Sequence, residues 1–191
     1  MIKTLKAAQE IAGKMSIKNS KQCYATRIEK IRPNVAAGWL KNWTKTMRTL
    51  ASDPAQWVEA SAYQINHYHK RTGQRYHRWF DSGDLENKAM LQSIVDVAKA
   101  TPDFRHWLPT KEKKLVRAYL KNNTLPDNLV IRVSSAMIDQ GPLSGFRNTS
   151  TVHRDQDPVG HSCPAKYQDH SCGDCRACWD PTVPNVSYPK H

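Results

Sequence analysis

The sequence predicts an α/β fold, either a small incomplete (β/α) barrel or an open parallel sheet. Three observations support this prediction. Residues 1–73 are basic and mainly helical in pattern, residues 74–158 alternate between strand and helix patterns, and residues 159–191 form a cysteine-rich, metal-binding type of segment. A chain of 191 residues has the length of about one domain, so we expect a single domain made of these three parts.

Two helices are predicted in the basic N-terminal part. Pro33 suits the first turn of a helix over residues 33–50. A second helix is expected after Asp53, because a capping residue followed by proline is a start signal, and it should stop at Gly73. The first helix has one apolar face, whose members recur every three or four positions: Trp39, Trp43, Met47 and Leu50.

The middle of the chain alternates between two hydrophobic patterns. Strands are expected over residues 75–80, 104–108, 129–133 and 151–153. Helices are expected over residues 85–100 and after Thr110, which we interpret as a capping residue. Strands that alternate with helices imply right-handed crossovers and a parallel sheet.

Polar residues follow two of these strands. In a parallel sheet the loops after the strands gather at one edge and carry the site. Asp81 and Ser82 follow the first strand and Lys111 follows the second, so these residues are candidates for binding a cofactor or a polar, anionic ligand. The competing interpretations are that Asp81 and Ser82 cap the next helix and that Lys111 is simply exposed to solvent. The loop after the last strand leads into the cysteine segment, which we therefore expect at the same edge.

Four cysteines lie within a short C-terminal segment: Cys163, Cys172, Cys175 and Cys178. Their spacing is C-x8-C-x2-C-x2-C, and the three closely spaced thiolates can wrap around one polynuclear centre, with a fourth ligand from elsewhere. The total of five cysteines is odd, which a closed set of intrachain disulfides does not satisfy. The segment therefore predicts an iron–sulfur cluster, either 4Fe–4S or 3Fe–4S.

The sequence leaves two points open: which cysteine is the fourth ligand, and whether the metal is iron or zinc. Cys23 lies far upstream and could supply the last thiolate while Cys163 stays free, or the reverse. The main competitor is a tetrahedral zinc site made by the four C-terminal cysteines, in which His161 or His170 could replace a thiolate. Such a zinc site would be structural and would have no redox role.

Positive charge is concentrated in one part of the chain. The net charge is +12, and residues 1–80 hold 15 Lys and Arg against four Asp and Glu. This concentration of positive charge attracts polyanions, so nucleic acid is a candidate partner for residues 1–80. The alternative is that the basic residues only keep the protein soluble. No apolar run approaches the roughly 18 residues of a membrane helix, and no secretory signal pattern is present, so we expect a reducing cytoplasm and no membrane partner.

Several short motifs occur in a specific order along nearly the whole chain. They are Cys23-Tyr24-Ala25, Arg78-Trp79-Phe80-Asp81-Ser82-Gly83-Asp84, Phe104-Arg105-His106-Trp107-Leu108-Pro109-Thr110-Lys111, Cys163-Pro164 and Cys172-Gly173-Asp174-Cys175-Arg176-Ala177-Cys178-Trp179. In this order the motifs resemble the gene product 88 family of phage proteins. The resemblance implies a phage-encoded protein of the host cytoplasm, with a partial barrel like that of radical-SAM enzymes and cysteines that bind iron and sulfur.

Three functional hypotheses follow. The first is an iron–sulfur protein of electron transfer or redox sensing, with a host redox partner. The second is a cluster-dependent enzyme that acts on nucleic acid or another anionic substrate, although the early C-x3-C-x2-C signature of radical-SAM enzymes is absent. The third is a zinc-stabilised module that binds nucleic acid.

Overall fold

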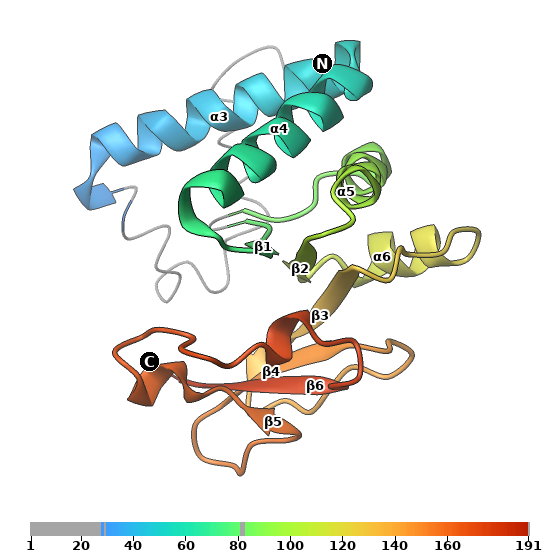
Figure 1. Ribbon diagram of the computed structural model, residues 1–191. Helices are drawn as coiled ribbons and strands as arrows, with labels where there is room; N and C mark the ends of the chain where they lie inside the picture. Colours follow the sequence, from blue (N-terminus) through green and yellow to red (C-terminus); the bar gives the residue numbers. More distant parts are fainter. Residues whose placement is uncertain (1–27, 29, 81–82, 191) are drawn as a thin grey trace. The chain divides into compact units, whose positions relative to one another are not determined.

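The computed structural model describes residues 28, 30–80 and 83–190 (Figure 1). The contacts of the chain divide it into two units, residues 1–48 and residues 49–191. Most of helix α3 (Pro33–Ser52) belongs to the first unit, and its last turn belongs to the second. The single domain with three parts that we expected stays a prediction.

Both predicted N-terminal helices are present, and their ends lie where local signals place them. α3 begins at Pro33, and α4 (Pro54–Thr72) begins after Asp53, whose carboxylate accepts the N–H of Gln56 at 2.9 Å. α4 ends at Gly73, which adopts a left-handed conformation with φ of 71°. A side chain at this φ would be strained, so the glycine determines where the helix stops.

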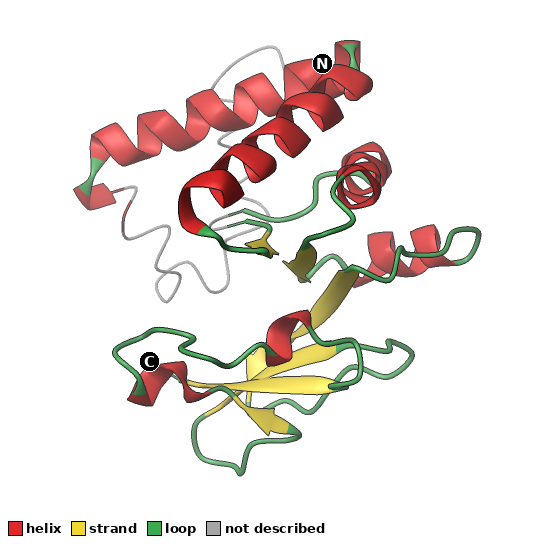
Figure 2. Ribbon diagram, in the orientation of Figure 1, coloured by secondary structure: helices red, strands yellow, loops and turns green. Residues whose placement is uncertain are grey.

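The second unit is built on a curled sheet of six parallel strands (Figure 2), in the order β1-β2-β3-β4-β6-β5 (strands labelled in Figure 1). Two helices, α5 (Lys88–Ala100) and α6 (Lys113–Leu120), connect β1 to β2 and β2 to β3. This α/β architecture confirms the predicted fold class. The strands are β1 (Tyr76–Arg78), β2 (Arg105–Thr110), β3 (Leu129–Ile138), β4 (Thr149–His153), β5 (His161–Ser162) and β6 (Asn185–Pro189).

The sheet has two different faces, because successive residues of a strand point to opposite sides. One face packs against α5 and α6 through an apolar core that includes Leu108, Ile131 and Val133. On the opposite face, Trp107 and Val186 pack with Ala177, Cys178 and other residues of the C-terminal segment. We refer to this second side, opposite α5 and α6, as the cysteine face.

Strand β6 was not predicted from the sequence. Its buried Asn185 and Ser187 are polar, and proline at position 189 argues against a strand. The two polar side chains are satisfied by β4, because Thr149 Oγ1 bonds Asn185 Oδ1 at 2.8 Å and Thr151 Oγ1 bonds Ser187 Oγ at 3.0 Å. A polar network therefore takes the place of the apolar pattern by which strands are recognised.

Two histidines lie on neighbouring strands with their ring centroids 5.5 Å apart, His77 on β1 and His106 on β2. Burial lowers the pKa of each imidazole to about 4, and for His106 the neighbouring His77 lowers it further. His106 has no exposed surface, and its Nε2 bonds the hydroxyl of Thr101 at 2.9 Å. Both imidazoles are therefore neutral in the folded protein at neutral pH.

We expect the free energy of unfolding to fall as the pH drops from about 6.5 towards about 4. In this window the histidines of the unfolded chain bind protons that those of the folded chain do not. The contribution of the two histidines to stability is therefore complete above the imidazole pKa of the unfolded chain and is lost on acidification. The contribution of His106 is at most about 3 kcal/mol. His106→Gln should reduce the slope of stability against pH in urea denaturation, and an unchanged slope would contradict this assignment.

Candidate metal centre

The cysteine segment begins where β5 ends. The N–H of Cys163, the residue after β5, donates to the carbonyl of Ser187 on β6 at 2.8 Å. Cys163 therefore lies at the carboxyl end of a parallel strand, the edge at which such sheets place their sites. The chain then forms a short 3-10 turn, η1 (Pro164–Tyr167), passes Cys172 and Cys175, and reaches a second one, η2 (Ala177–Trp179).

Cys178 is the most buried of the four thiols, with 7% of its surface exposed. Its Sγ lies 3.2 Å from the hydroxyl oxygen of Tyr188 on β6. Burial raises the pKa of Cys178 to about 11, while the Tyr188 hydroxyl and the charge of Arg132 oppose this rise. The thiol is therefore protonated at neutral pH and would lose its proton on binding a metal cation.

The other three thiols are near enough to influence one another. Burial raises the pKa of Cys163, and the neighbouring Cys172 and Cys175 raise it further. Cys163 and Cys172 also act on the pKa of Cys178. All four are free thiols, and Cys175 Sγ lies 3.3 Å from Nε2 of His161. Cys163 and Cys175 thus pack against the buried cluster that contains Cys178, and Cys172 lies near enough to raise the pKa of Cys163 and of Cys178.

The ligand set itself stays a prediction. Within residues 28, 30–80 and 83–190, no three histidine, cysteine, aspartate or glutamate side chains are arranged to hold a metal ion. Cys23 lies outside the described residues, so the structure does not decide whether it or Cys163 would complete the set.

A buried arginine fastens the cysteine segment to the sheet. Arg132 on β3 has no exposed surface, and its guanidinium donates five hydrogen bonds to backbone carbonyls. The shortest, at 2.6 Å, runs to Ala177, and Nε donates to Cys178 at 3.0 Å. The other acceptors are the carbonyls of Thr149, Asp180 and Val183.

The charge of Arg132 has a consequence for the site. Over the described part of the chain, no carboxylate forms an ion pair with this guanidinium. A buried cation without a paired anion is costly: burial lowers the pKa of Arg132, while Cys178, Tyr188 and the more distant charge of Asp180 raise it. Thiolates at this position would supply the missing negative charge. Arg132 was not among the predicted site residues. The sequence does mark it, because it is a charged residue inside the otherwise apolar run Leu129-Val130-Ile131-Arg132-Val133.

A buried N–H group beside the thiols lacks a hydrogen-bond acceptor. Trp107 on β2 is 7% exposed and belongs to the same buried cluster as Cys178, with Cys163 and Cys175 packed against it. Its Nε1–H has no acceptor among the described residues, which costs about 1–3 kcal/mol when such a donor is buried. The neighbouring Trp179 differs, because its Nε1–H donates to the carbonyl of His77 at 2.9 Å. The thiols, the unpaired cation and this free donor fit an anionic group that contains sulfur.

The candidate cofactor-binding residues lie apart from this group in the chain. Asp81 and Ser82 are outside the described residues, and Lys111, with an exposed side chain, follows the carboxyl end of β2. The N–H of Lys111 donates to Asp84 Oδ2 at 2.7 Å, and the Thr110 hydroxyl donates to the same carboxylate. The prediction that Thr110 caps the next helix is wrong, because α6 starts only at Lys113 and its cap residue is Glu112. The hydroxyl of Thr110 donates to Asp84 and accepts the N–H of Glu112 at 3.0 Å.

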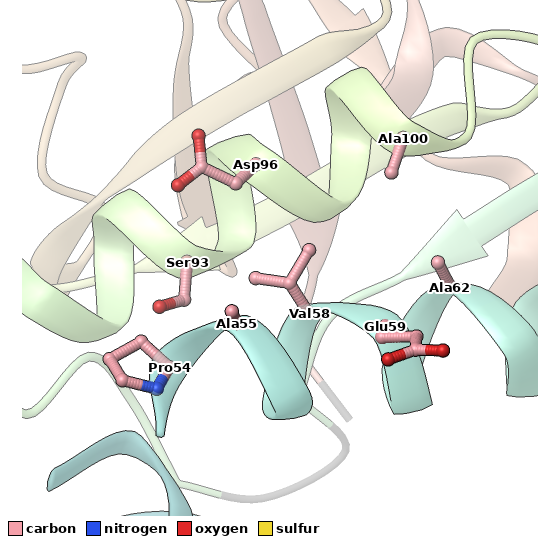
Figure 3. A pocket seen from close by; sticks show the side chains of 8 residues that line it. All are labelled: Pro54, Ala55, Val58, Glu59, Ala62, Ser93, Asp96 and Ala100. Carbon is pink, nitrogen blue, oxygen red and sulfur yellow. The ribbon is translucent and has the colours of Figure 1, made fainter. Parts of the chain in front are cut away.

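A shallow groove lies between α4 and α5 (Figure 3). α5 packs on the sheet face opposite the cysteines, so the groove takes no part in the candidate centre. Its lining includes the carboxylates of Glu59 and Asp96 and no thiol. The lining residues are Pro54, Ala55, Val58, Glu59, Ala62, Ser93, Asp96 and Ala100.

Comparison with known proteins identifies one relationship. The model of a family described as Gene product 88 matches residues 14–181, a span that contains all five cysteines. No curated protein and no solved structure matches the chain. None of the described helices is long and apolar enough to span a membrane.

Proposed function

This chain belongs to the gene product 88 family of phage proteins, and we propose that it is an iron–sulfur protein with a redox or electron-transfer role in the host cytoplasm. Cys172, Cys175 and Cys178 hold the cluster, of 4Fe–4S or 3Fe–4S type, and Cys163 or Cys23 completes the ligand set. The bound cluster supplies one-electron chemistry. The observation that carries this proposal is the group of four free thiols beside the unpaired charge of a fully buried arginine.

The residues around the thiols have separate roles in this proposal. The guanidinium of Arg132 balances the negative charge of the thiolates and fixes the backbone of Cys178 through its carbonyl. The hydroxyl of Tyr188 lies 3.2 Å from Cys178 Sγ, and the indole N–H of Trp107 has no acceptor among the described residues, so both would serve as donors to the sulfur atoms of the centre. Hydrogen bonds to sulfur, nearby positive charge and exclusion of solvent all tune the potential of such a centre.

Spectroscopy of the anaerobically purified protein tests this function. We expect a brown protein whose visible absorption bleaches with dithionite and returns on mild oxidation. One of the two oxidation states should give an electron paramagnetic resonance signal, because a single electron is exchanged. A colourless protein without a signal in either state would rule out the redox function.

Trp107→Phe should make the potential of the centre more negative, because a donor to sulfur is lost. A net hydrogen bond of about 0.5–1.5 kcal/mol corresponds to about 20–60 mV for one electron. The matched control is Trp179→Phe, whose lost N–H serves the carbonyl of His77 rather than a sulfur. Redox titration of both variants checks this expectation, and equal shifts in the two would contradict it.

One observation favours zinc as the second candidate. His161 Nε2 lies 3.3 Å from Cys175 Sγ, and imidazole with thiolates is a common ligand set for structural zinc. This alternative predicts a colourless protein in which His161→Ala lowers the zinc content. In an iron–sulfur protein the same substitution should leave the iron content unchanged.

Nucleic acid is a further proposed partner, through the basic residues of 1–80. Lys41, Lys45 and Arg48 are exposed on α3 and spaced four and three residues apart, so they share one side of the helix. Replacing the three by glutamine should weaken binding to DNA or RNA and flatten its salt dependence, while the visible spectrum stays unchanged. Fluorescence anisotropy at several salt concentrations measures this, and unchanged affinity would support a merely soluble basic surface.

A further inference from the structure

We propose that the cysteine face at β1 and β2 docks a small acidic one-electron carrier protein of the flavodoxin type. This inference rests on the proposed redox function and names the class of partner that the centre uses. It is based on five side chains that stack on one another beside the cysteines, which we refer to as the arginine–aromatic cluster: Tyr76, Arg78, Trp107, Arg176 and Trp179.

The cluster forms an unbroken series of ring and guanidinium contacts. The guanidinium of Arg78 lies over the ring of Trp107, 4.9 Å from its centroid, and that of Arg176 lies 4.7 Å from the centroid of Tyr76. Trp179 joins the two pairs, with ring centroids 5.2 Å from Trp107 and 5.6 Å from Tyr76. Contacts of this type hold long arginine side chains in defined positions.

One end of the cluster is in the cysteine core and the other is in solvent. Trp107 is buried together with Cys178, and Trp179 directly follows Cys178 in the chain. Tyr76 is 40% exposed and Arg78 is exposed, both on β1 at the edge of the sheet. Electron transfer slows steeply with distance, so a carrier that touches Tyr76 would reach the centre by a short path through conjugated rings.

The charge of this surface favours an acidic partner. Arg78 on β1 and Arg105 on β2 share the side of the sheet that bears Trp107, and no strand residue on that side of β1 and β2 is acidic. The neighbouring carboxylate of Asp180 is engaged by the N–H and hydroxyl of Thr182. Arginine side chains predominate on this surface, although the carboxylate of Asp180 lies beside it and Asp174 is exposed in the same loop as Arg176. A predominantly basic surface steers an acidic protein to its site, and arginine with aromatic residues is typical of interface centres.

Nucleic acid also carries negative charge, but the position of the cluster favours the carrier. A basic surface for nucleic acid does not need contact with the cysteine core, whereas electron exchange does. In the exchange, one electron leaves the reduced flavin of the carrier and enters the oxidised centre. The carrier is thereby oxidised by one electron and the centre is reduced by one.

The test uses the anaerobically purified full chain and a flavodoxin as the probe. Stopped-flow measurements give the rate at which reduced flavodoxin reduces the centre at several salt concentrations, and calorimetry gives the affinity for oxidised flavodoxin. Arg78→Gln and Arg176→Gln should each lower the rate by about three- to tenfold, weaken binding and flatten the salt dependence. Reduction by dithionite needs no docking and should be unchanged in Arg78→Gln. The guanidinium of Arg176 also donates to the carbonyls of Gly173 and Cys175, so iron per chain is measured in Arg176→Gln and its rates are compared per intact centre.

The matched control is Arg117→Gln. The guanidinium of Arg117 also lies 4.9 Å from a ring centroid, that of Phe146, but it belongs to α6, which packs on the opposite face of the sheet. This variant loses the same charge and a similar contact, so it should react like the unmodified protein. Equal losses in all three variants would show a general charge effect and overturn the docking site.

Two other results would also overturn the inference. One is an unchanged rate and affinity in both Arg78→Gln and Arg176→Gln. The other is loss of oligonucleotide binding in these variants while flavodoxin reacts normally, which would assign the surface to nucleic acid. If the unmodified protein contains no centre that dithionite can reduce, the proposed function fails; if dithionite reduces it but the arginines do not matter, only the docking site fails.

Discussion

Alanine at Cys172, Cys175 or Cys178 abolishes or severely reduces the cluster in each single variant. Each of these thiolates is expected to bind a separate iron, and the loop that carries them offers no spare thiol. The measurement is iron per chain, together with visible absorption, in anaerobically purified variants. At least one of Cys23 and Cys163 should be required as well.

A suitable control is Ser171→Ala, which changes the same loop without removing a thiol. Among the residues that the structure describes, the hydroxyl of Ser171 accepts only the N–H of Gly173, at 3.3 Å, so this variant should keep its iron. Full iron content in all three closely spaced cysteine variants would show that the centre lies elsewhere.

Arg132→Met lowers the free energy of unfolding by about 3–5 kcal/mol and releases the cluster. The substitution removes the guanidinium donor from five backbone carbonyls, of which those of Ala177, Asp180 and Val183 keep a second donor. It also removes the positive charge beside the thiols. Arg132→Lys should be intermediate, because an ammonium keeps the charge but has only three donors. Urea denaturation and iron analysis measure the two effects.

The comparison variant is Arg105→Met. Arg105 lies on the same side of the sheet, but it is exposed, and within the described part of the chain its guanidinium makes one long hydrogen bond, 3.3 Å to the carbonyl of Asp127. Its replacement should cost less than about 1 kcal/mol. If Arg132→Met were as mild as Arg105→Met, the arginine would not be what holds the cysteine segment.

Features that depend on neighbouring residues could be read from the sequence. The limits of α4 follow from Asp53 and Gly73, because a cap and a left-handed glycine act within one turn of the chain. The strand–helix alternation of the middle segment predicted the parallel sheet for the same reason. The cysteine spacing also pointed to a shared centre without knowledge of the fold.

Features that depend on distant residues could not be read in this way. Four of the five hydrogen bonds of Arg132 go to carbonyls of residues that lie 45 to 51 positions later in the sequence. Tyr188 reaches Cys178 only because β6 joins the sheet, and the polar residues of β6 gave no apolar signal. The free N–H of Trp107 is a property of the packed core, which no local pattern contains.

Iron, acid-labile sulfide and zinc per chain, measured together in anaerobically purified protein, test the central claim most directly. The iron–sulfur proposal predicts about three to four iron atoms per chain, a similar amount of sulfide and little zinc. About one zinc per chain with neither iron nor sulfide would contradict it.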